Sequence, residues 1–150
     1  MEEGARDNKH RRWWHLKKIN AVVLAGDNKQ EEMLKGVYNK ALLSIDGRPM
    51  VQYVINALRE SSYIDKISIV GPVDELSRFL KESVDYYFEG ESTLFDNVSI
   101  GIKPFEMDMG VLIVTSDIPL ISGDIVTDFL DECQGNGADL CYPIIDQKLN

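Results

Sequence analysis

Hydrophobic and polar positions along the chain follow two alternating patterns. Short apolar runs are typical of strands buried on both faces, and they predict β-strands at 21–24, 66–70, 85–88, 111–115 and 140–145. Between them, apolar residues recur every three or four positions, which predicts amphipathic helices at 49–58, 74–80, 93–102 and 122–133. Strands that alternate with helices favour a mostly parallel sheet covered on both faces, a single-domain, three-layer α/β/α, Rossmann-like fold.

Several helix boundaries carry capping signals. Asp74 stands where it would cap the second helix, with Phe79 on the side that faces the core. Thr93-x-x-Asp96 has the pattern of a capping box, in which two side chains satisfy the first free amides of a helix. Ser122 is expected to cap the last helix.

The order of the strands predicts where a ligand would bind. If the strands at 66–70 and 85–88 extend the sheet on one side of 21–24, then 111–115 must lie on the other side. In open parallel sheets, ligands bind beyond the carboxyl ends of the strands, at the point where strand order reverses. We therefore expect a crevice between Ala25-Gly26 and Ser116-Asp117.

Composition limits the function classes. A chain of 150 residues with 44% hydrophobic and 27% charged residues is typical of one soluble globular domain. The formal net charge of −9 argues against a nucleic-acid-binding surface. No segment is long and apolar enough to span a membrane, and we expect a cytoplasmic protein.

The N-terminal residues differ from the rest of the chain. Residues 1–18 hold six of the sixteen basic and three of the twenty-five acidic residues, so this arm carries +3 and the remainder −12. The arm also contains Trp13 and Trp14 and shows no periodicity. We expect a disordered arm ahead of a domain at 19–150. Contact with an anionic lipid surface or with nucleic acid is the alternative.

Cysteine and histidine positions exclude several chemistries. Cys133 and Cys141 form neither a C-x-x-C motif nor a disulfide framework, and we expect free thiols. Both histidines, His10 and His15, lie in the arm. A Ser-His-Asp triad or a histidine-bound zinc site is therefore hard to build in the domain.

A few polar residues lie where a phosphate ligand would bind. Ala25 and Gly26 end a buried strand with little side chain, so a ligand can approach the backbone, and Lys29, Lys35 and Lys40 follow. Asp117 follows the strand at 111–115, and its carboxylate is a suitable ligand for Mg²⁺. Each feature also has a purely structural interpretation: an ordinary turn for Gly26, a surface lysine for Lys40, and a turn aspartate before Pro119 for Asp117.

Two further residues are candidates for contacting the base or ribose. Gly90 would let the backbone approach a flat base, or it simply ends a strand. Asn97 offers an amide donor and an acceptor to a ligand, or it lies on the polar face of its helix. The chain has no G-x-G-x-x-G after a strand, no G-x-x-x-x-G-K-[ST] and no G-x-S-x-G.

Four segments in order resemble a known family. AVVLAG, NKALLSIDGRPMVQYVINAL, EGESTLFDNVSIG and VLIVTSDIPL are similar to the nucleotidyltransferase superfamily with the GT-A-like fold, closest to MobA-like NTP transferases. The kin of these proteins include molybdenum-cofactor guanylyltransferases and sugar-phosphate nucleotidyltransferases. The resemblance covers about residues 19–145.

The resemblance implies roles for the residues that match the motifs. Leu24, Ala25 and Gly26 match the nucleotide-binding turn, and Lys40 matches the lysine that contacts the phosphates during transfer. Gly90 and Asn97 fall near the contacts to base and ribose. Asp117 matches the metal-binding aspartate, so the resemblance implies Mg²⁺ or another divalent cation, with Lys40 and Asp117 as catalytic residues.

The chain departs from the family pattern in three ways. Asp27 stands where a second small residue is usual, and the signature arginine is missing, with Lys29 or Lys35 as its substitute. The family also continues well past this chain's end, where acceptor contacts and a second acidic metal ligand come from. The chain is therefore similar to a C-terminally truncated or degenerate copy.

Two functions follow as expectations. The first is transfer of an NMP from an NTP to a phosphate-bearing acceptor such as a sugar phosphate or cofactor, with release of pyrophosphate. The second is an NTP-binding module, regulatory or degenerate, that does not transfer. A glycosyltransferase on the same fold ranks low, because the D-x-D metal motif is missing after Ser116.

Overall fold

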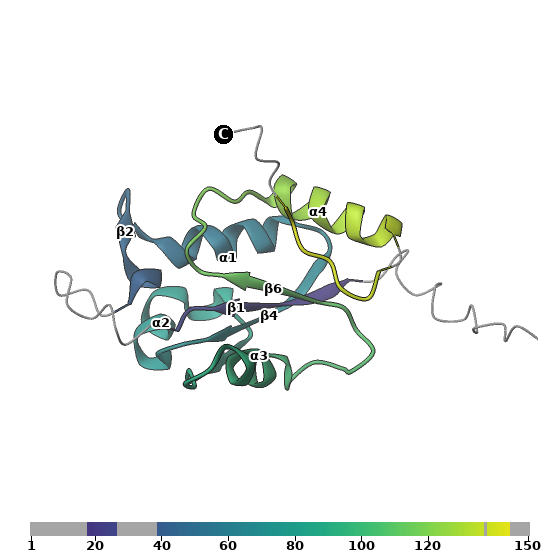
Figure 1. The fold of residues 1–150 in the computed structure, drawn as a ribbon. Helices are drawn as coiled ribbons and strands as arrows, with labels where there is room; N and C mark the ends of the chain where they lie inside the picture. The colour runs from purple at the N-terminus through teal and green to yellow at the C-terminus, as the bar shows by residue number, and fades with distance from the viewer. Residues whose placement is uncertain (1–17, 27–38, 137, 145–150) are drawn as a thin grey trace, which may run out of the picture.

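Four parallel strands form the centre of the domain. The computed structural model describes residues 18–26, 39–136 and 138–144. The sheet has the order β5-β4-β1-β6, and every neighbouring pair in it is parallel (Figure 1). The strands are β1 (Ile19–Leu24), β4 (Ile64–Val70), β5 (Tyr86–Phe88) and β6 (Val111–Thr115). The predicted placement of β6 on the opposite side of β1 from β4 is thus confirmed.

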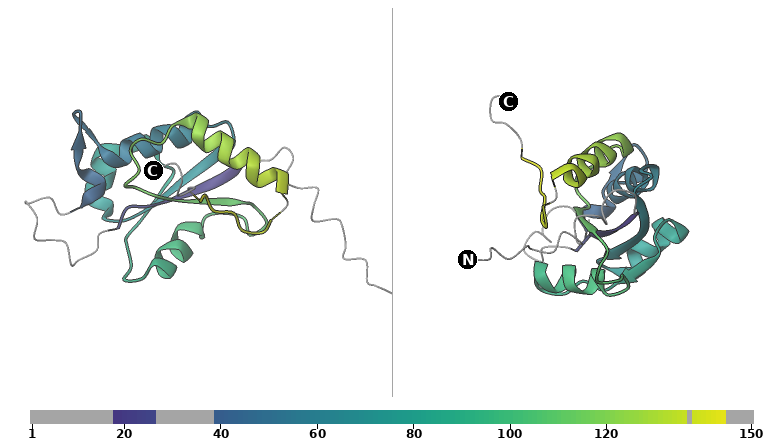
Figure 2. Two further views of the ribbon diagram at one scale, coloured as in Figure 1. Left: turned by 45° about the horizontal axis from the view of Figure 1, so that its top comes forward. Right: turned by 90° about the vertical axis from the view of Figure 1, so that its right-hand side faces the viewer.

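Helices cover both faces of this sheet. α1 (Met50–Glu60) and α4 (Gly123–Asn136) pack together on one face, and α3 (Leu94–Ile102) packs under β1 and β4 on the other (Figures 1 and 2). α2 (Val73–Leu80) contacts β5. Two short 3-10 helices are also present, η2 (Lys40–Leu42) and η3 (Lys81–Ser83). The predicted three-layer α/β/α fold is confirmed. No helix in the described part of the chain is long and apolar enough to cross a membrane.

A small hairpin stands apart from the main sheet. β2 (Ser44–Ile45) and β3 (Arg48–Pro49) are antiparallel and are joined by Asp46 and Gly47. Both turn residues have positive φ, 49° and 80°, which matches the backbone twist of a two-residue hairpin. Met50 N then donates to Leu43 O at 2.8 Å, so the hairpin leads directly into α1.

The core lies between the sheet and α1, as the hydrophobic pattern indicates. The fully buried residues of α1 recur on one stripe and pack against the apolar side chains of β1 and β4. The opposite face is closed by α3, whose Gly101 allows a close approach. A Cβ on Gly101 would lie 2.4 Å from Val22 Cγ1 and 3.1 Å from Val70 Cγ2.

Two predicted details near the C-terminus are wrong. Residues 140–144 form no strand; Leu140, Tyr142 and Ile144 are largely exposed, and Pro143 has no N–H to donate to a ladder. α4 continues through Gly135 to Asn136, beyond the predicted end at 133.

α2 begins differently from the prediction. Pro72 occupies the cap position and no side chain of α2 caps the helix, so Asp74 lies in the first turn instead. Glu89 Oε1, beyond β5, accepts from Val73 N at 3.1 Å and so satisfies a free amide at the start of the helix. Phe79 is 55% exposed, whereas Leu76 and Leu80 are buried. The caps at Thr93 and Ser122 are confirmed, because their hydroxyl oxygens accept from Asp96 N and Ile125 N. The Asp96 carboxylate accepts from the Thr93 hydroxyl, so it does not complete the capping box through a backbone amide.

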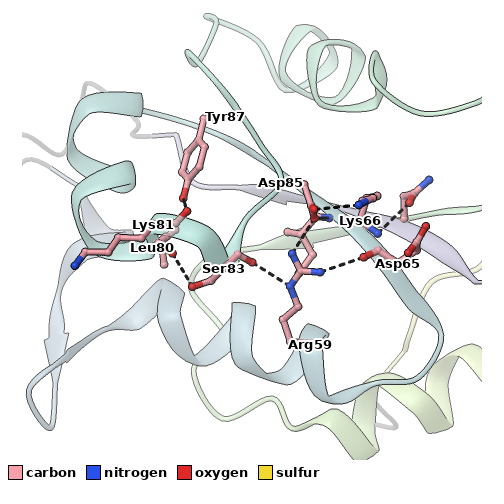
Figure 3. Close-up of polar contacts among 10 residues, drawn as sticks. Arg59, Asp65, Lys66, Leu80, Lys81, Ser83, Asp85 and Tyr87 are labelled. Carbon is pink, nitrogen blue, oxygen red and sulfur yellow. Dashed lines mark hydrogen bonds and ion pairs between the residues drawn. The ribbon is translucent and has the colours of Figure 1, made fainter.

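One arginine joins the end of α1 to the opposite edge of the sheet (Figure 3). Arg59 donates to Ser83 O and Asp65 O at 3.0 Å each and to Asp85 Oδ2 at 2.8 Å. Asp85 also accepts from Ile67 N at 2.8 Å. Desolvation alone would raise the pKa of Asp85, but the Ile67 N–H and the charges of Arg59 and Lys66 hold that pKa below its usual value.

Candidate functional site at the carboxyl edge of the sheet

The ends of β1 and β6 lie side by side. Leu24 pairs with Thr115 in register, and Ser116 N donates to Leu24 O at 3.1 Å. Gly26 and Asp117 each lie two residues beyond this pair and are therefore at the same edge of the sheet. The structure thus confirms that the ends of β1 and β6, predicted from the sequence to flank a crevice, are neighbours.

Two other strand ends complete this edge. Ala25 N donates to Val70 O at 2.8 Å, and Gly71 N donates to Phe88 O at 2.9 Å. A Cβ on Gly71 would lie 2.6 Å from Ala25 O, and one on Gly90 would lie 3.6 Å from Gly71 Cα. The backbones after β1, β4 and β5 thus approach one another closely, and Gly71 allows the tightest of these contacts.

Asn97, near the start of α3, lies next to this group of turns. Its Oδ1 accepts from Glu91 N at 2.6 Å, and its Nδ2 donates to Glu91 O at 3.3 Å. Nδ2 also lies 3.9 Å from where a Cβ on Gly26 would be. The side chain therefore holds the backbone after Gly90 against α3. Asn97 is at the predicted site, and its amide is already bonded to the protein's own backbone.

A buried asparagine brings Lys40 to the same edge. Asn39 is 3% exposed; its Nδ2 donates to Ala25 O at 2.8 Å, and its Oδ1 accepts from Ala41 N at 2.9 Å. Asn39 caps η2, so the first residue of η2, Lys40, is held beside the turn after β1. The Lys40 side chain is exposed.

Sequence reasoning missed Asn39 and Gly71. Asn39 precedes the candidate lysine, and its type favours capping a short helix. A glycine such as Gly71 is also common at ordinary strand ends, so its type alone does not indicate a close backbone contact. Lys29 and Lys35 lie outside the described residues, as does Asp27.

Asp117 is the candidate metal ligand at this edge. Asp117 is exposed, and within the described ranges no group of three or more His, Cys, Asp or Glu residues is placed to hold a metal ion. A single carboxylate suits Mg²⁺ whose other ligands are phosphate oxygens and water. Of the residues at this edge that the structure describes, Asp117 therefore offers one carboxylate for such an ion.

The two cysteines lie away from this edge, and the chemistry of Cys133 argues against a nucleophilic role for its thiol. Both are free and partly exposed, as predicted. Burial, followed by a hydrogen bond with Cys141, raises the pKa of Cys133 to about 11. Cys133 is therefore a neutral thiol near pH 7, and the thiolate is the nucleophilic form of cysteine.

A model of the MobA-like NTP transferase domain matches residues 21–149. The chain belongs to this family. Membership confirms the resemblance seen in the four sequence segments and makes the protein a member of a nucleotidyltransferase enzyme family.

Curated members of the superfamily share moderate identity with this MobA-like domain. It is 27% identical over 115 residues to the bifunctional protein GlmU of Thermoanaerobacter pseudethanolicus, which covers 75% of this chain and 24% of GlmU. It is 37% identical over 65 residues to the 2-C-methyl-D-erythritol 4-phosphate cytidylyltransferase of Clostridium perfringens, covering 43% of this chain and 28% of the relative.

Solved structures share the fold. A hypothetical transferase from Thermus thermophilus is 30% identical with a TM-score of 0.63, over 77% of this chain and 46% of that one. Rv0371c from Mycobacterium tuberculosis, solved in complex with manganese, is 14% identical with a TM-score of 0.60, over 79% of this chain and 61% of that one. The MobA-like domain described here thus spans about a quarter of the GlmU chain and less than half of the Thermus protein.

Proposed function

We propose that the protein binds an NTP at the carboxyl edge of its sheet and transfers the NMP to a phosphate-bearing acceptor, releasing pyrophosphate. Family membership supports nucleotidyl transfer as the type of reaction. The observation that carries the proposal is the meeting of the Gly26 turn, the Gly71 and Gly90 backbones and Asp117 at one edge. Small residues there leave room for a ligand to approach the backbone.

Each residue at this edge has a proposed role. The turn at Leu24, Ala25 and Gly26 receives the phosphates. The side chain of Lys40 meets the negative charge that develops on them. The backbone around Gly90, which Asn97 holds in place, forms the surface for the base.

The chemical step needs little covalent participation by the protein. An oxygen of the acceptor attacks the α-phosphorus, the bond from that phosphorus to the bridging oxygen breaks, and its electrons leave with pyrophosphate. Such transfers depend on positioning and on charge stabilisation. The chain's contribution is therefore to fix the nucleotide against β1 and to place the positive charge of Lys40 nearby.

A divalent cation, Mg²⁺ by preference, is proposed to bind with the nucleotide. Asp117 supplies the protein's carboxylate ligand, and the ion when bound neutralises charge on the phosphates. The manganese complex of Rv0371c supports a metal in this superfamily. The acceptor is proposed to carry a phosphate because the Clostridium perfringens relative is a cytidylyltransferase named for a phosphate ester.

A second candidate function is NTP binding without transfer. The observation in its favour is the sequence after Gly26, where Asp27 stands in place of a second small residue and the arginine of the family pattern is missing. A domain that holds a nucleotide without these residues would serve as a regulatory module.

Thermal unfolding with each of the four NTPs and Mg²⁺ tests binding, and pyrophosphate release in the presence of sugar phosphates tests transfer. An NTP at about 100 times its Kd is expected to stabilise the protein by about 2.7 kcal/mol. Stabilisation together with pyrophosphate release supports the transferase, whereas stabilisation without release supports the binding module. The absence of stabilisation by every NTP contradicts both.

Variants assign the roles. Lys40→Ala is expected to slow transfer by about 10²–10³-fold, equivalent to about 3–4 kcal/mol, because a preorganised charge is lost. Lys66→Ala, which removes an exposed lysine that contacts Asp85, is the matched control and should keep its rate. Asp117→Asn should raise the Mg²⁺ concentration needed for half-maximal activity; an unchanged titration would remove Asp117 from the metal site.

A further inference from the structure

The peptide unit between Ala25 and Gly26 lies at the end of β1, where the strand leaves its hydrogen-bonded ladder. On the β4 side, Ala25 N donates to Val70 O at 2.8 Å. On the β6 side, Leu24 O accepts from Ser116 N at 3.1 Å. Successive residues of β1 thus face the two neighbouring strands in turn, so the amide of Gly26 faces β6. Among the described residues, Gly26 N has no hydrogen-bond partner, and Gly26 is exposed. This amide is therefore accessible to a ligand.

The carbonyl of the same peptide unit is bonded on its other side. Ala25 is fully buried, and its oxygen accepts from Asn39 Nδ2 at 2.8 Å. A trans peptide unit is planar, so its C=O and its N–H point in opposite directions. The bond from Asn39 therefore also fixes the direction of the Gly26 amide, toward the strand end from which Asp117 follows.

This peptide unit needs such a bond to keep its orientation. Gly26 adopts a wide range of backbone angles at little cost, so the unit before it can rotate. Gly71 lies beside Ala25 O and has no side chain to block that rotation; a Cβ there would lie 2.6 Å from the oxygen. Rotation would leave the amide of Asn39, which is 3% exposed, without its acceptor. A buried unpaired donor is unfavourable, so Asn39 retains the orientation.

The other end of the Asn39 amide acts on Lys40. Asn39 Oδ1 accepts from Ala41 N at 2.9 Å, and Asn39 O accepts from Leu42 N at 3.1 Å. Ala41 is fully buried and belongs to the core cluster. Lys40 thus lies between two buried residues that fix its backbone, while its own side chain is exposed at the edge.

We propose that Asn39 is a positioning residue for the transfer reaction: its Nδ2 directs the Gly26 amide and its Oδ1 places Lys40, so that both meet the phosphates of one nucleotide. This inference rests on the proposed function and adds to it a residue that touches neither nucleotide nor acceptor. A backbone N–H and an ammonium group both bind anions. Groups that are oriented before the ligand arrives bind it without a further cost of ordering.

Asn39→Ser separates the two bonds. Serine keeps a side-chain oxygen that can cap η2, but the side chain ends one bond earlier and cannot also reach Ala25 O. The ligand is the NTP that gives the largest thermal stabilisation of the wild type, together with Mg²⁺. Its Kd, measured by calorimetry, should rise about tenfold in the variant, as expected for the loss of one hydrogen bond to a charged group. An unchanged Kd would overturn the proposal.

Asn20→Ser is the matched control, because Asn20 is equally buried at the opposite end of β1. Asn20 is 3% exposed, and its Oδ1 accepts from Lys66 N at 3.2 Å. Both serine variants lose bonds of a buried asparagine, so both should unfold at a lower urea concentration than the wild type. NTP binding should weaken in Asn39→Ser alone. Equal rises in Kd for the two variants would mean that Asn39 contributes only to stability, which overturns its positioning role.

Asn39→Ala removes both bonds and so tests the placement of Lys40. Pyrophosphate release by this variant should be about tenfold slower than by Asn39→Ser, because a misplaced charge stabilises the transferring phosphates less. In a Lys40→Ala background, the alanine and serine variants should release pyrophosphate at the same rate, since the lysine through which the cap acts is gone. A difference that persists in that background would overturn the action of Oδ1 through Lys40.

An NMR titration of the wild type gives an independent result if the serine variant does not fold. The resonance of the Gly26 amide proton should move downfield when the NTP and Mg²⁺ are added, because the proton then donates to a phosphate oxygen. An unmoved resonance in a protein that binds the NTP would overturn the inference and leave the proposed function intact. A wild type that binds no NTP would contradict the proposed function itself, and the inference would fall with it.

Discussion

The two flanks of β1 differ sharply in how closely they are packed. On the side of β4, Ile67 and Ile69 are fully buried. Backbones approach closely at Gly71, and Arg59 joins α1 to three separate segments. On the side of β6, Ile113 is 40% exposed and an open groove runs along the strand. The same central strand thus has a closely fitted neighbour on one side and a loosely covered one on the other.

This difference separates two roles within one sheet. The closely packed flank fixes the turns after β1, β4 and β5, and a binding edge built from backbone groups requires such fixed positions. The open flank tolerates a further segment without disturbing those turns. Substitutions on the β4 side should therefore lower the free energy of unfolding strongly, and substitutions on the β6 side should change it little.

The largest effect is expected for Gly71→Ala. Its Cβ would lie 2.6 Å from Ala25 O and 2.9 Å from Ala25 C, and backbone atoms cannot rotate away as a side chain can. We expect a loss of about 3 kcal/mol in the free energy of unfolding, measured by urea denaturation, together with a smaller NTP-induced rise in Tm. Gly90→Ala is the control for stability, because its nearest contact would be an ordinary 3.6 Å. Equal free energies of unfolding for the two variants would show that the backbone around Ala25 moves to accommodate the added methyl group, which would contradict close packing on this flank.

The next largest effect is expected for Gly101→Ala, which should lower the free energy of unfolding by about 2 kcal/mol. Its Cβ would lie 2.4 Å from Val22 Cγ1, a methyl group that has some freedom to move. The double variant with Val22→Ala removes that methyl and should recover part of the loss in the same denaturation assay. Strictly additive losses would mean that α3 does not press on β1 at this point.

A smaller and pH-dependent effect is expected for Asp85→Asn. The pKa of Asp85 is lower in the folded protein than its ordinary value of 3.8, so the ionised form stabilises the fold. That contribution is present above about pH 4 and is lost as the pH falls through the folded-state pKa. We expect the variant to lose about 1 kcal/mol at pH 7, and the difference from the wild type to shrink below pH 4.

Asp65→Asn is the control for this pH dependence. It removes the same charge from β4, and Arg59 contacts only the backbone oxygen of Asp65 (Figure 3). Parallel stability curves for Asp85→Asn and the wild type between pH 2 and 7 would contradict the assigned role of the carboxylate.

The smallest effect is a gain on the open flank. Gly135 lies in the last turn of α4, and a Cβ there meets nothing within 4 Å. Gly135→Ala is expected to stabilise the protein by about 0.5–1 kcal/mol through helix propensity. Calorimetry should show a small rise in Tm, and a fall would mean that the end of α4 needs glycine.

Much of the fold could be predicted because its signals are local and periodic. Apolar runs and helical spacing located the four strands of the sheet and α1, and one topological argument placed β6 beside β1. The wrong strand at 140–145 shows the limit, since an apolar run containing Pro143 can also pack as an irregular segment. Glu89 likewise replaces Asp74 at the start of α2 through a contact that sequence spacing does not show.

The site could be predicted only in part, for a similar reason. Gly26 and Asp117 follow strands whose order could be argued, so their shared edge was predictable. Asn39 and Gly71 depend on contacts between distant segments, and neither residue type signals such contacts. Asn97 was identified by position, yet its bonds to the Glu91 backbone follow from how α3 meets the end of β5.

The bond from Asn39 to Ala25 has a consequence for evolution and for engineering. It joins Ala25 and Asn39, fourteen residues apart in the sequence, at 2.8 Å, so both ends of the intervening segment are held at the same edge of the sheet. Lengthening a closed loop adds little entropic cost once its ends are fixed. Insertions between these two residues are therefore expected to cost little in closure entropy, and they would enter the chain beside the edge proposed to bind the nucleotide.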